Sequence, residues 1–264
     1  MMAHPALLDA LVAVRRHLGR GLVGAIAALG VLHVLAVVTA SFWRTATPSV
    51  RSTIGAWLHL DSEAGLGTWF AVVQLALAAV IAALIARAQR GRGASWLGWA
   101  GAATLLAVMS MDEQVLLHES LGLVGSRLGV TVGGQQVWFV PALVLVLAVG
   151  IALLPFVVRL PRRTRRGLLG GGALYLLGAV GFEALSWVWV VVIADDPAAA
   201  LSPVVGMLQL GEETLELLAV TVVIATLLDY AAESVRVDST TAPPAPGAHV
   251  PGHDKAVAAS HARG

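Results

Sequence analysis

The chain has 264 residues, of which 58% are hydrophobic and only 12% are charged, and its mean hydropathy is +0.82. Because soluble domains carry about 25% charged residues, this composition indicates an integral membrane protein. The net charge of +1, without a basic groove or a stacking platform, argues against nucleic-acid binding. The absence of cysteine excludes disulfides, thiol catalysis, iron–sulfur clusters and cysteine-ligated zinc.

Six stretches are long and apolar enough to span a membrane, which takes about 20 mostly apolar residues. In chain order they cover approximately residues 21–43, 66–88, 95–119, 137–159, 167–193 and 203–228. The sequence therefore predicts an all-α fold, a polytopic transmembrane helix bundle. Residues 1–20 are expected to form an amphipathic segment on the cytoplasmic surface, and residues 21–233 the bundle. Residues 234–264 have the composition of a disordered tail.

Arginines alternate with acidic connections along the chain. They precede the first span and lie between the second and third spans and between the fourth and fifth. Connections on the other side carry acids, such as the pair Asp195 and Asp196. The positive-inside rule therefore predicts that both termini are cytoplasmic. Nearly all basic residues are arginine, with Lys255 the single lysine, which is typical of a GC-rich bacterial genome. The predicted location is the bacterial cytoplasmic membrane, with the lipid bilayer as the surrounding partner.

Seven carboxyl groups fall inside the predicted spans, and the three spans that carry them contain no lysine or arginine. These residues are Asp112, Glu113, Glu119, Glu183, Glu212, Glu213 and Glu216. A charge at the centre of a bilayer costs at least about 2.5–3.5 kcal/mol, so seven unpaired anions are not tolerated there. Either several of these groups are protonated, or cations share the site with them. Both arrangements point to a functional site.

The acids of the third, fifth and sixth spans are expected at one height. Counting inward from the arginine-rich side places them in one layer near the membrane midplane. At 100° per residue, Asp112 and Glu119 share one helix face, while Glu212, Glu213 and Glu216 fall within an arc of about 100°. These faces should turn toward the bundle interior, because lipid does not accept them. Other polar residues expected to face this interior are His33, Gln74 and Ser186.

This layer has the chemistry of a cation site. Carboxylate oxygens with one or two imidazoles suit a divalent ion, with Fe, Mn, Mg, Ca or Zn as candidates. The candidate ligands are Asp112, Glu113, His118, Glu119, Glu183, Glu212, Glu213 and Glu216. The analogy to di-iron carboxylate bundles is partial, because Glu213-x-x-Glu216 stands where a second Glu-x-x-His would be. Alternatively, the closely spaced carboxyl groups share protons and relay them. Nothing in the sequence signals haem, flavin or a nucleotide.

At these residues the chain resembles a family of uncharacterised bacterial multi-spanning membrane proteins. The matching elements are Ser110-x-Asp112-Glu113 followed by His118-Glu119, Asp61-Ser62-Glu63 before the second span, and Glu212-Glu213-Thr214-Leu215-Glu216 in the sixth. The resemblance covers roughly residues 55–230. It implies membership of that family and attaches no activity to it.

Three functions remain open from the sequence. The first is a divalent-metal site between the third, fifth and sixth spans, serving metal transport or membrane-embedded metal-dependent catalysis. The second is a proton- or cation-coupled transporter or channel that uses the same acids as a relay, where a homo-oligomer could supply the pathway. The third is a structural or partner-binding subunit, which would turn its polar face outward. Concentration of the acids at one height favours metal binding, since a relay should continue to both surfaces. Whether the protein is an enzyme stays open.

Overall fold

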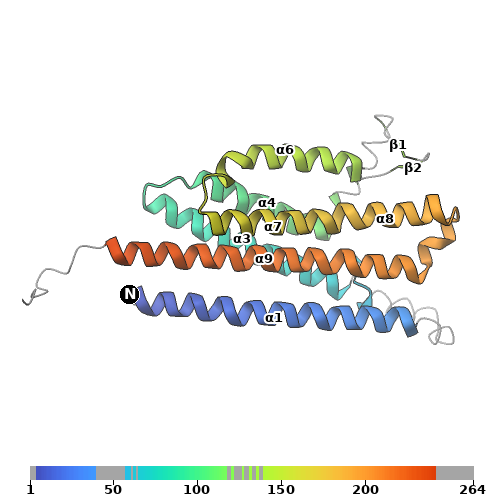
Figure 1. Ribbon diagram of the computed structural model, residues 1–264, viewed down its shortest axis with the longest axis horizontal. Helices are drawn as coiled ribbons and strands as arrows, with labels where there is room; N and C mark the ends of the chain where they lie inside the picture. Colours follow the sequence, from blue (N-terminus) through green and yellow to red (C-terminus); the bar gives the residue numbers. More distant parts are fainter. Residues whose placement is uncertain are drawn as a thin grey trace, which may run out of the picture.

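In the computed structural model, several helices pack against one long helix, α9 (Pro203–Thr241). It contacts α1 (His4–Thr39), α3 (Leu66–Gly91) and α7 (Arg162–Leu176), and all of these run lengthwise beside it (Figure 1). The structure describes residues 4–39, 57–60, 62–63, 65–117, 120–121, 127, 131–132, 135–136 and 139–241.

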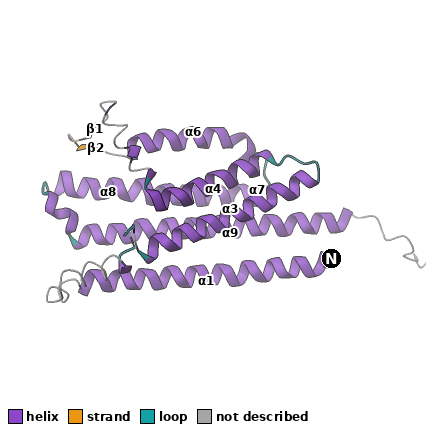
Figure 2. Cartoon of the chain, turned by 180° about the vertical axis from the view of Figure 1, so that it is seen from behind, coloured by secondary structure: helices purple, strands orange, loops and turns teal. Residues whose placement is uncertain are grey.

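The helices further from α9 form a second row. The helix α4 (Leu97–Val115) packs against α3, and α6 (Phe139–Val157) rests on α4 at the edge of the bundle (Figure 2). A short turn joins α3 to α4, and Gly93 adopts a positive φ of 68° there, a conformation that side-chain-bearing residues rarely adopt. Such a short connection makes neighbouring helices antiparallel.

The all-α class is confirmed in the described residues, with one small exception. The strands β1 (Thr131–Val132) and β2 (Gln135–Gln136) form a two-residue antiparallel pair. The pair lies between α4 and α6 in the sequence, and every other described element is helical. It is too short to add a sheet layer to the helix bundle.

Four described helices are long and apolar enough to cross a membrane. They are Ala6–Thr39, Leu66–Gly91, Arg162–Ile193 and Pro203–Val237, and a shorter apolar helix covers Leu143–Val157. Large apolar side chains also point outward, among them Val144 on α6, which is 66% exposed. An exterior of this kind suits lipid better than water, so the fold is that of a membrane-embedded helix bundle.

The third predicted span ends earlier than the sequence suggested. The apolar run predicted a helix over 95–119, whereas α4 ends at Val115 and Leu116 follows with a left-handed φ of 55°. The expectation that Asp112 and Glu119 share one helix face needs an unbroken helix, so it is wrong as a helical-phase prediction. Glu119 and the neighbouring His118 lie outside the described residues.

The fifth predicted span, 167–193, is one helical rod with changes of pitch. After α7 come a π-helical turn, η2 (Leu177–Phe182), then α8 (Glu183–Trp187) and a second π-helical turn, η3 (Val188–Ile193). A 3₁₀ helix, η4 (Pro197–Leu201), leads into α9. The first π turn lies directly before Glu183, and wide turns of this kind occur frequently at functional sites.

Polar contacts connect the ends of α1 to neighbouring elements, and one of them uses His33, which was expected inside the bundle. His33 is fully buried, its Nε2 lies 2.8 Å from the carbonyl oxygen of Gly206, and its Nδ1 accepts the backbone N–H of Leu60 at 3.1 Å. The ring therefore carries its proton on Nε2 and joins α1 to the start of α9. At the opposite, arginine-rich end, Arg15 pairs with Asp229.

Candidate functional site

The described acids come from three helices that meet in one region of the bundle. Asp112 and Glu113 stand in the last turn of α4, Glu183 begins α8, and Glu212, Glu213 and Glu216 lie on α9. All six residues are half-buried. The other two candidate ligands, His118 and Glu119, fall outside the described residues.

A tyrosine connects the acids of two of these helices. The Tyr175 hydroxyl on α7 donates a hydrogen bond of 2.9 Å to Oε1 of Glu113 on α4. Glu216 and Glu213 on α9 lie close enough for their charges to act on the same phenol, and Glu212 lies close enough to act on Glu216. The structure thus brings three carboxyl groups from two helices near one hydroxyl on a third helix, with Glu212 beside Glu216.

The close approach of α9 depends on glycine. A Cβ atom at Gly178 would lie 2.9 Å from the carbonyl oxygen of Glu212 and 2.9 Å from Cγ of Glu216, so a side chain has no room there. Two turns earlier, a Cβ at Gly171 would stand 3.2 Å from the carbonyl oxygen of Ala219. Small residues of this kind let helix backbones touch in membranes. Here they press the acid-bearing face of α9 against the rod 162–193.

One turn further along the rod, the glycine belongs to α9 and the large side chain belongs to the rod. Phe182 packs on Gly211, leaving no space for a side chain at that position of α9. The ring fills the groove left by the glycine, directly beside Glu212 in the sequence. Because Gly178 and Phe182 both belong to η2, the wide π-helical turn is the segment in contact with the acids of α9.

Asp112 and Glu183 stand on the same helices as, or next to, the residues around Tyr175. The groups that act on Tyr175 and Glu216 include Glu113, Glu212 and Glu213, whereas Asp112 and Glu183 are not among them. Among the residues that the structure describes, no group of three or more His, Asp or Glu side chains could hold a metal ion as placed.

A layer of neutral polar contacts lies next to the acids. Ser110, which opens the acidic motif of α4, donates from Oγ to the carbonyl oxygen of Val72 on α3 at 2.9 Å. Gln74 on α3 donates from Nε2 to Oγ1 of Thr221 on α9 at 3.1 Å, and its side chain is only 1% exposed. The Gln74 Oε1 atom has no hydrogen-bond partner among the described residues. Such an atom marks a place where a water molecule or an ion would be favoured.

The sequence did not point to Tyr175. It is one of only two tyrosines in the chain, and its position in the fifth predicted span could have marked it as a polar residue in an apolar helix. Its position two turns before Glu183 was a further signal. What the sequence could not show is that the hydroxyl reaches across to α4.

Comparison with known proteins assigns the chain to a family without giving an activity. A family model described as "Domain of unknown function (DUF8692)" matches residues 11–231. The chain belongs to this family. The expected membership of an uncharacterised family is thereby confirmed, while the proposed motif and bacterial origin stay predictions. Neither the curated proteins nor the solved structures contain a match.

Proposed function

We propose that the protein is an integral protein of the bacterial cytoplasmic membrane with six spans and both termini in the cytoplasm. Four spans correspond to the long apolar helices, and α4 and α6 would supply the other two, each with 19 residues. Support for the orientation comes from the arginines at the end of the bundle where Arg15 meets Asp229. The domain division into residues 1–20, 21–233 and 234–264 belongs to the same proposal.

Within this bundle, we propose a cation site formed by the carboxyl groups between α4, the rod 162–193 and α9. The observation that carries the proposal is the convergence of Glu113 and Glu216 on the Tyr175 hydroxyl, with Glu212 and Glu213 beside them. Carboxyl groups this close repel one another when ionised, because the apolar surroundings screen their charges weakly. Neutralisation by protons or by a divalent cation relieves that repulsion.

The site would exchange protons for a divalent metal ion. Metal binding needs deprotonated ligands and therefore releases protons. The carboxyl groups around Tyr175 would move closer together to coordinate the ion. Further candidate ligands are Asp112, Glu183, His118 and Glu119. Oxygen ligands of this kind suit Mg, Ca, Mn or Fe, and a histidine would extend the choice to Zn. The bound ion would serve metal transport or membrane-embedded metal-dependent catalysis.

The first experiment is elemental analysis of protein purified in mild detergent without chelator. The unmodified chain is compared with the double variant Glu183→Gln and Glu216→Gln. Glu233→Gln is the matched control, because Glu233 lies on α9 but pairs with Arg236 at the arginine-rich end. A stoichiometric metal that is lost in the double variant and kept in the control supports the metal site. Equal metal content in all three samples refutes it.

A proton- or cation-coupled transporter is the second candidate, and a specific contact favours it. A phenol hydrogen-bonded to a carboxyl group can pass a proton, and Tyr175 bridges acids of α4 and α9 in this way. On the inward side, the buried pair Gln74 and Thr221 offers a further polar step. Proton flux into liposomes with no bound metal, abolished by Tyr175→Phe, would favour this function over metal binding.

A structural or partner-binding subunit is the third candidate. It requires acids that turn outward to meet the basic residues of a partner. The packing of Gly178 against Glu216 and the bond from Tyr175 to Glu113 both favour an inward-facing cluster instead. Co-purification with a basic partner that is lost when Glu113 and Glu216 are changed to glutamine would favour this candidate instead.

A further inference from the structure

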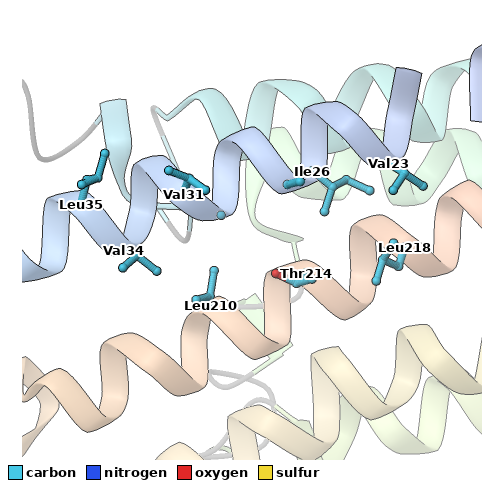
Figure 3. A pocket seen from close by; sticks show the side chains of 10 residues that line it. Val23, Ile26, Val31, Val34, Leu35, Leu210, Thr214 and Leu218 are labelled. Carbon is cyan, nitrogen blue, oxygen red and sulfur yellow. The ribbon is translucent and has the colours of Figure 1, made fainter. Parts of the chain in front are cut away.

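A groove separates α1 from α9 on the side of the bundle away from the acids. Figure 3 shows its walls, with side chains from both helices pointing into it. The groove encloses about 540 Å³ and is open along its length. Its lining is Val23, Ile26, Ala27, Gly30, Val31, Val34, Leu35, Leu210, Thr214 and Leu218. The only polar side chain in this set is Thr214, so the groove suits an apolar chain.

The acids do not reach this groove. At 100° per residue, Leu210, Thr214 and Leu218 share one face of α9, and Glu216 lies about 160° away from its centre. Glu216 instead meets Gly178 on the opposite side of α9. The groove is therefore a second feature of the fold, independent of the carboxyl site.

Two arginines lie in line with the groove, between its lining and the end of the bundle where α1 begins. On α1, Arg16 and Arg20 lie on the same helix face as Val23, Ala27 and Val34, one and two turns before the lining starts. Both side chains are exposed, and neither forms an ion pair with another described residue. The neighbouring acid on α9, Asp229, is instead paired with Arg15.

The length of the groove matches one leaflet of a bilayer. From Val23 to Leu35, α1 rises about 18 Å, and half of a hydrocarbon core is about 15 Å thick. Arg20 stands about 4.5 Å before the groove begins, at the height of a lipid headgroup if the arginine-rich end faces the membrane surface. An apolar groove of leaflet length with cations at its mouth is complementary in shape and charge to an anionic phospholipid.

We propose that the groove between α1 and α9 binds one anionic phospholipid from the leaflet on the arginine-rich side. An acyl chain fills the apolar part beside Ile26 and Leu210, and the phosphate meets Arg16 and Arg20. Guanidinium groups bind phosphate oxygens through paired hydrogen bonds, which gives the headgroup its specificity. A second copy of the chain is an alternative occupant that the experiment distinguishes.

The test is native mass spectrometry of the full chain in detergent, titrated with phosphatidylglycerol or with phosphatidylcholine of identical acyl chains. We expect one tightly held phosphatidylglycerol per chain and weaker binding of the zwitterionic lipid. The double variant Arg16→Gln and Arg20→Gln should lose about thirty-fold in affinity for phosphatidylglycerol, as expected for two arginines near an anionic surface. The control Arg162→Gln and Arg163→Gln removes two exposed arginines elsewhere and should bind as the unmodified chain does.

A second pair of variants tests the apolar part. Ala27→Phe fills the groove and displaces two or three methylene groups, which predicts a loss of about fifteen- to sixty-fold. The matched control Ala28→Phe adds the same ring to the next, exposed position of α1, outside the lining, and should leave binding unchanged.

Three results would overturn the proposal. The first is equal binding of both lipids, and the second is an equal effect of the two arginine pairs. The third is a dimer of the unmodified chain that Ala27→Phe converts to a monomer, because a second copy would then fill the groove. Glu216→Gln should bind the lipid normally, so failure of the carboxyl-site proposal leaves this one intact.

Discussion

Substitution of Gly178 by alanine tests whether the glycine contact positions the acids. The added Cβ atom would lie 2.9 Å from both the Glu212 carbonyl oxygen and Glu216 Cγ, closer than real Cβ atoms come to a neighbour. The carbonyl belongs to the α9 backbone and cannot move alone, so η2 and α9 must separate by several tenths of an ångström. Overpacking of this kind costs about 1–3 kcal/mol of unfolding free energy.

The matched control is Gly172→Ala on the same helical rod. A Cβ atom at Gly172 would have nothing within 4 Å, and alanine there gains helix propensity of about 0.5–1 kcal/mol. At about 2–4 °C per kcal/mol, we expect Gly178→Ala to lower the thermal midpoint in detergent by about 2–12 °C and Gly172→Ala to hold or raise it.

Metal uptake by the same two variants also reports on the cation site. If η2 positions Glu216, Gly178→Ala should reduce metal uptake along with stability, whereas Gly172→Ala should change neither. Equal thermal midpoints for the two variants would refute the close packing of η2 on α9. A destabilised Gly178→Ala variant with normal metal uptake would show that the packing is real but does not position the cation ligands.

Three further substitutions probe the polar contacts, each through the thermal midpoint in detergent. Tyr175→Phe removes the bond to Glu113 and should cost about 1.5–3 kcal/mol, so an unchanged midpoint would contradict that contact. Gln74→Leu should change stability by less than about 1 kcal/mol, because Thr221 keeps its bond to the carbonyl oxygen of Leu217. A larger loss would mean that Gln74 Oε1 holds a water or an ion. His33→Leu leaves the buried N–H of Leu60 unpaired, at about 1–3 kcal/mol, and also removes the contact with Gly206. A loss no larger than that of Gln74→Leu would refute the proposed tie.

Features that depend on local composition could be predicted from the sequence. The helix predicted at 66–88 is observed as Leu66–Gly91, and that predicted from 203 begins at Pro203. Runs of apolar residues and the charges that bound them decide these limits, because each span must match the bilayer on its own. The list of acids followed from the same reading, whereas membership of an uncharacterised family followed from the resemblance of motifs. The tail beyond residue 241 lies outside the described residues.

The tertiary structure decided how those acids are grouped. The left-handed Leu116 ends α4 before Glu119, so the shared face of Asp112 and Glu119 did not follow from 100° steps. The π-helical turn η2 also shifts the phase of the rod before Glu183. The Tyr175 hydroxyl joins α7 to Glu113 of α4, and Gly178 lets Glu216 of α9 approach the same rod closely. Contacts between helices that are distant in the sequence depend on how side chains fit across an interface. Composition and periodicity do not specify that fit.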